Sequence, residues 1–481
     1  MNTLESLIQK WVTEIEDQQF LIGPQVSSTG VSVAVIKDAK ISHLQGLGLS
    51  DRETGESVTP DTVFPIASIT KSFTAAALIT ALRASRKGGP ETRIRDLDPS
   101  FELSSEKVSR EARFSDLLSH RTGLPRHDSL WARAEMAETE IFRRLKFLEM
   151  DPLDGSGFRQ SFQYNNILYG YCGKTIELLT GIKWKNYIET SILKPLEMSQ
   201  TWMEYDLIPQ KIPQAKPYFR DLPTPILKRW TVQGAAAIFS TAENVARWLI
   251  LQIGKGQWNG ASVLPEDIFE STLWKAWNDA QGSPEVAGCF ESSDYGLGWF
   301  LDKFLGRRCL HHGGSANGSS AFAAFMPDER VGVVVLANQT LSRLPRLLSK
   351  RLLGYLLEDG RPQNDRFAPT SLFSPDTLMP LFENSDLPLA PAPGVQWAES
   401  SLGNYVHPGY GEIRVVRNNE FLDFYYGLER WPAIAVSDTV AKARLPLIGM
   451  PCTILIQRTA ESLELPFNLY PENREHGFHA S

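Results

Sequence analysis

The chain has 481 residues, of which 42% are hydrophobic and 22% are charged, and its formal net charge is −7. This length allows a large buried core and two or three domains. The acidic balance, without any block of lysine and arginine, argues against a surface for nucleic acid, so we expect no nucleic-acid partner.

The sequence gives no sign of a membrane span, a disulfide framework or a metal site. No apolar run reaches the roughly 18 residues that a membrane span requires. Residues 1–12 place charges between apolar residues at helical spacing, which predicts an amphipathic helix and not a signal peptide. The four cysteines, 172, 289, 309 and 452, are far apart and form no CxxC pair. We therefore expect a reduced, cytoplasmic protein without a metal.

The first elements are a hairpin and a helix that carries a serine and a lysine. Residues 30–36 and 41–48 alternate apolar with small or polar side chains and predict a β-hairpin. From Ser68, apolar residues recur at helical spacing to Leu82, which predicts a buried helix. Ser68 then lies in the first turn with Lys71 on the same face, where an amine of lowered pKa could take the hydroxyl proton. Alone, the spacing also fits an ordinary N-capped helix with a solvated lysine.

The middle of the chain offers two further candidates. Residues 114–120 predict a helix that stops before Gly123, with His120 either a catalytic base or a partner for the last helical carbonyls. A second helix is expected around residues 131–148. Tyr164 and Asn166 precede an apolar helix and should project from its leading loop. The proline-rich residues 203–230 predict a pocket wall.

The last third predicts strands and then a change of composition. Residues 295–300, 309–315, 321–325 and 331–336 read as antiparallel strands, so the first 360 residues should form an α+β domain whose two ends share one sheet. We expect a catalytic domain over residues 1–360, a proline-rich linker over 361–394 and a small all-β accessory domain over 395–481. Asn418 and Asn419 predict a hairpin turn in that domain.

Three motifs follow one another in a fixed order: Ser68-x-x-Lys71, Tyr164-x-Asn166 and His312-Gly313-Gly314. With them, about residues 28–345 resemble the serine β-lactamase and penicillin-binding-protein superfamily, in its class C-like branch of esterases, D-aminopeptidases, D-Ala-D-Ala carboxypeptidases and transesterases. Matching flanks lie at residues 62–67, 118–125, 295–299 and 334–338. The resemblance implies a β-lactamase/transpeptidase-like fold, an antiparallel sheet flanked by helices with a helical subdomain, followed here by the small all-β domain.

The resemblance also implies catalytic roles. Ser68 would attack a carbonyl and form an acyl-enzyme, while Lys71 and Tyr164 move the proton. Asn166 would hold Lys71 and the acyl group in place. The backbone N–H groups of Ser68 and Ser315 would form the oxyanion hole.

His312 departs from the lysine that many β-lactamases and carboxypeptidases use to bind a substrate carboxylate. A mostly neutral imidazole weakens the case for a β-lactam substrate. Gly313 and Gly314 fit a strand that a substrate backbone approaches closely. For the apolar wall of the substrate pocket we expect aromatic side chains that core packing would explain equally well: Trp131, Tyr218, Phe219 and Trp230.

The expected activity is hydrolysis of a small ester or amide, without a cofactor. Acyl transfer to an alcohol or amine, similar to fungal transesterases of secondary metabolism and fed by an acyl thioester, is the second hypothesis. β-Lactamase, D-aminopeptidase or D-Ala-D-Ala carboxypeptidase action is the third, and a non-catalytic ligand-binding protein on the same fold is the fourth. A Ser-His-Asp hydrolase is disfavoured because Gly313-Gly314-Ser315-Ala316-Asn317 breaks the G-x-S-x-G pattern. A metalloenzyme is disfavoured because no HExxH is present.

Overall fold

A computed structural model describes most of the chain. In the N-terminal part it covers residues 3–20, 29–131, 136–151, 155–219, 222–281, 290, 293–316, 318–340 and 342–358. In the C-terminal part it covers residues 402–419, 421–426, 429–437, 440–447, 450–458, 462–465 and 476–480. The predicted linker over 361–394 lies outside the described residues.

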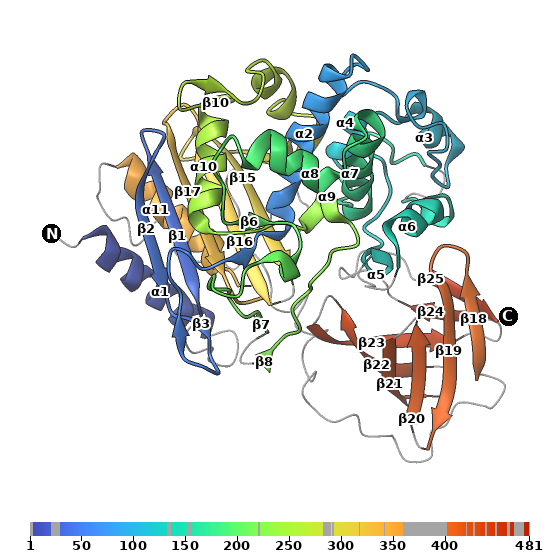
Figure 1. Cartoon of the computed structure of the whole chain (residues 1–481). Coiled ribbons are helices and arrows are strands. Elements are labelled where there is room, and N and C mark those ends of the chain that lie inside the picture. Colours follow the sequence, from blue (N-terminus) through green and yellow to red (C-terminus); the bar gives the residue numbers. More distant parts are fainter. Residues whose placement is uncertain are drawn as a thin grey trace.

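An antiparallel sheet is the central layer of the N-terminal part, and its described strands follow the order β12-β13-β14-β15-β16-β17-β1-β2 (Figure 1). These strands are β1 (Val31–Lys37), β2 (Lys40–Leu47), β12 (Asn278–Asp279), β13 (Asp294–Tyr295), β14 (Phe300–Phe304), β15 (Arg307–Ala316), β16 (Ser319–Met326) and β17 (Val331–Ala337). The two ends of this part meet where β1 pairs with β17, in the register Val33 to Val335. The prediction that the terminal segments share one sheet is therefore confirmed.

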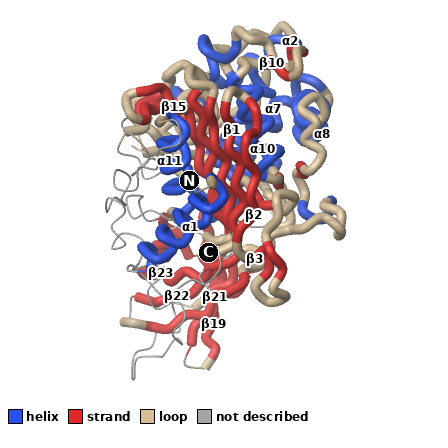
Figure 2. The backbone as a smooth tube through the Cα atoms, turned by 90° about the vertical axis from the view of Figure 1, so that its left-hand side faces the viewer, coloured by secondary structure: helices blue, strands red, loops and turns tan. Residues whose placement is uncertain are grey.

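Helices cover both faces of the sheet. On one face, α1 (Leu4–Phe20) and α11 (Leu344–Leu357) pack against β1, β16 and β17 through an apolar cluster that includes Trp11, Val33 and Leu348. On the other face lie α10 (Ala242–Ile253) and the helical subdomain, in which α2 (Thr70–Ala84), α7 (Asn166–Thr180) and α9 (Gln233–Ala236) contact one another. Figure 2 shows α1 and α11 on the side of the sheet opposite α7 and α10.

The helix that carries Lys71 is buried almost throughout, because its outward positions are also apolar or small. Phe73 stacks on Trp248 of α10 at a ring distance of 4.2 Å, and the Trp248 Nε1–H donates to Ser72 Oγ. The helix differs from the prediction at its start, since Ser68 lies in a 3₁₀ turn (Ala67–Ile69) and the α-helix begins at Thr70. A tighter first turn of this kind is common at helix N-termini.

Shorter elements connect these layers. The remaining α-helices are α3 (Glu106–Glu111), α4 (Phe114–Leu118), α5 (Asp128–Trp131), α6 (Glu138–Arg144) and α8 (Trp184–Ile188). The remaining strands before residue 300 are β3 (Leu49–Asp51), β4 (Glu56–Ser57), β5 (Phe64–Pro65), β6 (Thr201–Trp202), β7 (Tyr218–Phe219), β8 (Leu222–Pro223), β9 (Phe239–Ser240), β10 (Gln257–Trp258) and β11 (Ala261–Ser262). Short 3₁₀ and π turns occupy Ile94–Asp96, Leu145–Phe147, Glu189–Leu193, Tyr205–Leu207 and Phe269–Leu273. In place of the single helix expected around 131–148, the described residues of this range hold the end of α5, then α6 and a 3₁₀ turn.

The C-terminal part is all-β, as predicted, and its strands close into a barrel when β25 pairs with β18 (Figure 1). The strands are β18 (Gly403–His407), β19 (Gly411–Asn418), β20 (Phe421–Tyr426), β21 (Glu429–Ala435), β22 (Val440–Leu447), β23 (Met450–Arg458), β24 (Ser462–Leu465) and β25 (His476–Ala480). The predicted turn after Asn418 joins β19 to β20, and Asn419 has the left-handed φ of 57° that such a turn requires.

The barrel contacts the helical subdomain through the turn between β18 and β19. The Tyr410 hydroxyl lies 2.5 Å from His127 Nδ1, and His127 Nε2 lies 2.9 Å from the Glu149 carbonyl oxygen. The Nε2–H therefore donates to that carbonyl, and Nδ1 accepts from Tyr410. Arg144 also donates to the Gly409 carbonyl at 3.3 Å.

No helix in the described ranges combines the length and the apolar character that crossing a bilayer requires.

Candidate active site

Lys71 is the centre of the candidate site. Its side chain is completely buried, and its Nζ donates to Ser68 Oγ at 3.0 Å, Asn166 Oδ1 at 2.7 Å and the Ala235 carbonyl at 3.1 Å. Three acceptors match the three donors of an ammonium group. The prediction that Ser68 and Lys71 share one face of the turn is therefore confirmed, and the solvated lysine of an ordinary capped helix is excluded.

Ser68 is held in a strained turn. Ala67, which precedes it, has a φ of 46°, in the left-handed region that side chains with a Cβ rarely occupy. Such strain persists only where the surrounding structure enforces it. The Ile66 N–H donates to the Ile238 carbonyl, and Ser68 itself is half-buried. The turn therefore presents the Ser68 hydroxyl to Lys71 while leaving part of the serine accessible.

Asn166 is fixed at both ends of its side-chain amide. Asn165 caps α7 by accepting from the Leu168 N–H, and Asn166 begins the helix. Its Oδ1 accepts from Lys71, and its Nδ2 donates to Asp128 Oδ1 at 3.3 Å. The sequence reading missed Asp128, a buried carboxylate that also accepts from Arg126 and Trp131. Its position shortly after Pro125 gave no signal of this long-range contact.

Tyr164 lies beside Lys71. Its ring centroid is 4.7 Å from Lys71 Nζ and 4.9 Å from the Arg126 guanidinium carbon, and only 6% of the residue is exposed. The His120 ring lies on it at a centroid distance of 4.3 Å. The structure thus brings together the first two predicted motifs around one buried amine.

His312 also reaches this centre, but as a neutral group with both ring nitrogens engaged. Its Nδ1 donates to the Gly313 carbonyl at 2.6 Å, and its Nε2 accepts from the Tyr295 hydroxyl at 3.1 Å. Burial, followed by the charge of Lys71, lowers its pKa to about 3. His312 therefore supplies no positive charge for a substrate carboxylate. His311 lies with Phe322 and Phe290 in the separate apolar cluster beneath α11.

Strand β15 runs directly against the turn of Ser68. A Cβ atom on Gly314 would lie only 2.3 Å from the Ile66 carbonyl oxygen, whereas one on Gly313 would meet nothing closer than the Phe322 ring at 3.7 Å. The close neighbour of Gly314 is thus the protein's own backbone. The contact brings Ser315, which follows Gly314 and is exposed, to the edge of the Ser68 turn.

An apolar cavity adjoins the same edge. Its volume is about 390 Å³ when the open solvent at its mouth is included, and its lining includes Pro65, Pro217, Trp230 and Ala316. Trp230 stacks on Trp131 at 5.9 Å, and the Trp131 Nε1–H donates to Asp128. The cavity wall is therefore connected to the residues that hold Asn166.

Of the four expected wall residues, Trp230 alone lines this cavity, since Trp131 only stacks on Trp230 and the other two lie elsewhere. Tyr218 and Phe219 form β7 and do not line this cavity. The Tyr218 hydroxyl accepts from the Arg52 N–H at 2.8 Å, and the Arg52 guanidinium lies 4.2 Å from its ring centroid. Among the described residues, no three His, Cys, Asp or Glu side chains gather in a way that could hold a metal ion.

Comparisons with known proteins find relatives that match about two thirds or more of this chain. The chain is 27% identical over 426 residues to "Unguisins hydrolase ungD" of Aspergillus violaceofuscus, covering 80% of this chain and 73% of that protein. It is 23% identical over 330 residues to "Protein flp" of Staphylococcus aureus, covering 66% of this chain and 61% of that protein. The chain thus spans less than two thirds of the length of this second relative.

Solved structures share the fold. The octameric penicillin-binding protein homologue from Pyrococcus abyssi aligns with a TM-score of 0.64 at 19% identity, covering 97% of this chain and 99% of that chain. A class C beta lactamase from Rhodobacter sphaeroides aligns with a TM-score of 0.57 at 21% identity, covering 72% of this chain and 99% of that chain. The β-lactamase/transpeptidase-like fold is therefore confirmed.

A model of the Beta-lactamase family matches residues 10–353, a range that contains the Ser68 turn, the start of α7 and strand β15. With the fold and the family match in agreement, the chain belongs to the Beta-lactamase family of serine hydrolases.

Proposed function

We propose that the protein hydrolyses a small ester or amide through an acyl-enzyme on Ser68. The observation that carries the proposal is the buried Lys71 amine, which contacts Ser68 Oγ and Asn166 Oδ1 at once. Ser68 Oγ attacks the substrate carbonyl, and its proton passes to Tyr164 in its phenolate form, either directly or through Lys71, which takes up the serine proton as it gives one of its own to Tyr164. The same groups then return a proton to the leaving alcohol or amine.

The developing oxyanion would be bound by the backbone N–H groups of Ser68 and Ser315. The close packing of Gly314 on Ile66 supports this pairing, because it brings the strand that carries Ser315 to the turn that carries Ser68. Fixed backbone donors of this kind typically contribute 10² to 10³ in rate. Water then attacks the acyl-enzyme and restores Ser68.

The substrate is expected to carry an apolar group beside the scissile bond. The cavity lined by Trp230 and Ala316 begins next to β5 and the end of β15, and it is mainly apolar. A neutral His312 in place of a cation weighs against β-lactams and D-peptides that present a carboxylate there. The relative named as a hydrolase supports hydrolysis, and the substrate in its name is attributed to that relative alone.

Acyl transfer to an alcohol or amine is the second candidate. Acyl transfer would use the same acyl-enzyme as hydrolysis. The two reactions would differ only in whether water or a bound acceptor attacks the acyl-enzyme. Ser68 is half-buried, and Pro65, shortly before it in the chain, lines an apolar cavity, an arrangement compatible with an acceptor that displaces water.

The test combines labelling with a substrate panel. A fluorophosphonate should add one label by intact mass to the wild type and to Ser85→Ala, a serine at the far end of α2, but none to Ser68→Ala. A panel of nitrophenyl esters, D-amino-acid amides, a chromogenic cephalosporin and acyl thioesters with alcohol acceptors then separates the activities. Tyr164→Phe should lower turnover by about 100-fold or more. Labelling that survives Ser68→Ala, or normal turnover in Tyr164→Phe, would show that the assigned roles are wrong.

A further inference from the structure

His120 sits in the turn after α4 in a conformation that is unfavourable in two respects. Its φ is 58°, in the left-handed region, and its side chain is completely buried. Its Nε2 has no hydrogen-bond partner among the described residues. A buried, unpaired N–H typically costs about 1–3 kcal/mol. A residue that combines backbone strain with an unpaired buried donor is kept only where the surrounding structure enforces it, which is typical of functional sites.

His120 forms hydrogen bonds with the residue before Tyr164 and with the residue after it. The Gln163 N–H donates to the His120 carbonyl at 2.8 Å, and the Asn165 N–H donates to His120 Nδ1 at 3.0 Å. Between these two bonds, the imidazole lies over the Tyr164 ring at 4.3 Å with an interplanar angle of 31°. His120 thus fixes the backbone on each side of Tyr164 and one face of its ring.

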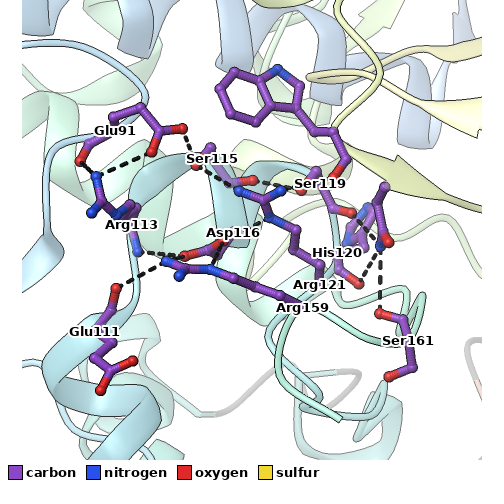
Figure 3. A network of polar contacts seen from close by, with 12 residues as sticks. Glu91, Glu111, Arg113, Ser115, Asp116, Ser119, His120, Arg121, Arg159 and Ser161 are labelled. Atoms are coloured by element: carbon purple, nitrogen blue, oxygen red, sulfur yellow. Dashed lines mark hydrogen bonds and ion pairs between the residues drawn. The ribbon is translucent and has the colours of Figure 1, made fainter.

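The turn of His120 is itself held by a polar network, which Figure 3 shows. The buried Asp116 carboxylate accepts from Arg121 at 2.6 Å and from Arg159 at 2.8 and 2.9 Å. The Arg159 N–H donates to the Arg121 carbonyl, and Asn278 Nδ2 donates to the Ser119, His120 and Ser161 carbonyls. The loops before and after the turn are therefore tied to β12 and to each other.

These contacts correct both sequence interpretations of His120. Its side chain does not donate to the carbonyls at the end of α4, because Nδ1 is an acceptor and Nε2 has no partner among the described residues; only its backbone N–H donates there, to the Leu117 carbonyl. Its geometry also argues against a general base, because the one ring lone pair, on Nδ1, already accepts from the Asn165 N–H and the proton is on Nε2. Burial, followed by the nearby charges of Lys71, His312 and Arg126, lowers the pKa of His120 well below the usual value and keeps the ring neutral. A neutral imidazole with a free Nδ1 lone pair is the form that the Asn165 N–H requires.

We propose that His120 is a positioning residue for Tyr164 and affects turnover only through the Tyr164 hydroxyl. This inference rests on the proposed role of Tyr164 in proton transfer. His120 does not exchange a proton with the substrate. It holds the phenol beside Lys71 Nζ, where a displacement of about 1 Å is enough to cost on the order of 10²-fold in rate.

The test is a double-mutant cycle between His120→Ala and Tyr164→Phe, assayed with para-nitrophenyl butyrate. Phe keeps the ring at position 164 and removes only the hydroxyl. In the wild-type background, His120→Ala should lower kcat by about 10- to 100-fold while KM changes by less than about threefold. In the Tyr164→Phe background, the same change should alter kcat by less than about twofold, because the group on which His120 acts is already absent.

A conservative variant and a matched control complete the design. His120→Asn keeps an acceptor near the position of Nδ1, and asparagine tolerates a left-handed φ, so this variant should recover part of kcat. If His120→Ala does not fold, the double-mutant cycle with Tyr164→Phe is measured with His120→Asn instead. His311→Asn removes an equally buried histidine, also with an unpaired nitrogen, from the separate cluster beneath α11 and should leave kcat unchanged.

The outcomes separate the two levels of the argument. Equal losses from the His120 variant in both backgrounds, or wild-type kcat in His120→Ala, would overturn the positioning role while leaving Tyr164 as the proton-transfer group. Normal turnover in Tyr164→Phe alone would instead overturn the proposed function of Tyr164, and with it the inference.

Discussion

Replacing Gly314 with alanine should separate β15 from the turn that carries Ser68. The new Cβ atom would lie 2.3 Å from the Ile66 carbonyl oxygen, while ordinary contacts begin at 3.4 Å. Strand or turn must therefore move by about 1 Å, a displacement that is enough to cost about 100-fold in rate at an active site. Overpacking of this kind also destabilises by about 1–3 kcal/mol. Gly313→Ala is the matched control, since its Cβ would meet only the Phe322 ring at 3.7 Å.

Two measurements test this reasoning. Steady-state hydrolysis of para-nitrophenyl butyrate should show the loss in kcat for Gly314→Ala and near-normal kcat for Gly313→Ala. Thermal melts of both variants report the accompanying loss of stability. Wild-type kcat in Gly314→Ala, or equal losses in the two variants, would refute the view that this contact sets the distance between the strand and the nucleophile.

Three further predictions concern stability. Burial lowers the pKa of His127 to about 4, and burial together with the charge of Lys71 lowers the pKa of His312 to about 3. As the pH falls below 6.5, these two histidines therefore become protonated in the unfolded chain while they are still neutral in the folded protein. Stability should then fall by about 1.4 kcal/mol per pH unit for each group down to about pH 4.5, and a pH-independent melting temperature would contradict this. Tyr410→Phe removes the hydroxyl that donates to His127 and should lower the free energy of unfolding by about 1–3 kcal/mol in urea denaturation. Tyr425→Phe, at a half-buried barrel position, is the control and should change it little. Equal losses of stability in the two variants would argue against the contact. Asp116→Asn leaves two partly exposed arginines without their buried carboxylate and should cost about 2 kcal/mol or more, which an unchanged urea midpoint would disprove.

Local periodicity predicted the parts of the site that depend on neighbours in the chain. The apolar spacing after Ser68 predicted a buried helix, and the loop before Asn166 was expected to project its side chains. The spacing of Ser68 and Lys71 placed both on one face, as the 3.0 Å contact now shows. The order of the three motifs then pointed to the fold, because the motifs converge only when distant segments share one sheet.

The contacts between distant segments could not be read from the sequence. Asp128 is 38 residues from Asn166, and His120 is 45 residues from Asn165, so no spacing rule relates them. The start of α2 was misplaced because a 3₁₀ turn and an α-helix have the same apolar pattern over three residues. Tyr218 resembled a pocket residue by its type alone, while its actual partner is the Arg52 backbone.

The pairing of β1 with β17 has a consequence for the synthesis of the protein. The Gly30 N–H donates to Asn338 Oδ1, 308 residues further along the chain. At typical ribosomal rates of about 5–20 residues per second, the β1–β2 hairpin waits about 15–60 s for its neighbour. During that time the edge that carries Val31, Val33 and Val35 has no partner strand, although all three are fully buried in the finished sheet. An unpaired apolar edge invites aggregation, so the nascent chain should depend on a chaperone until β17 is made.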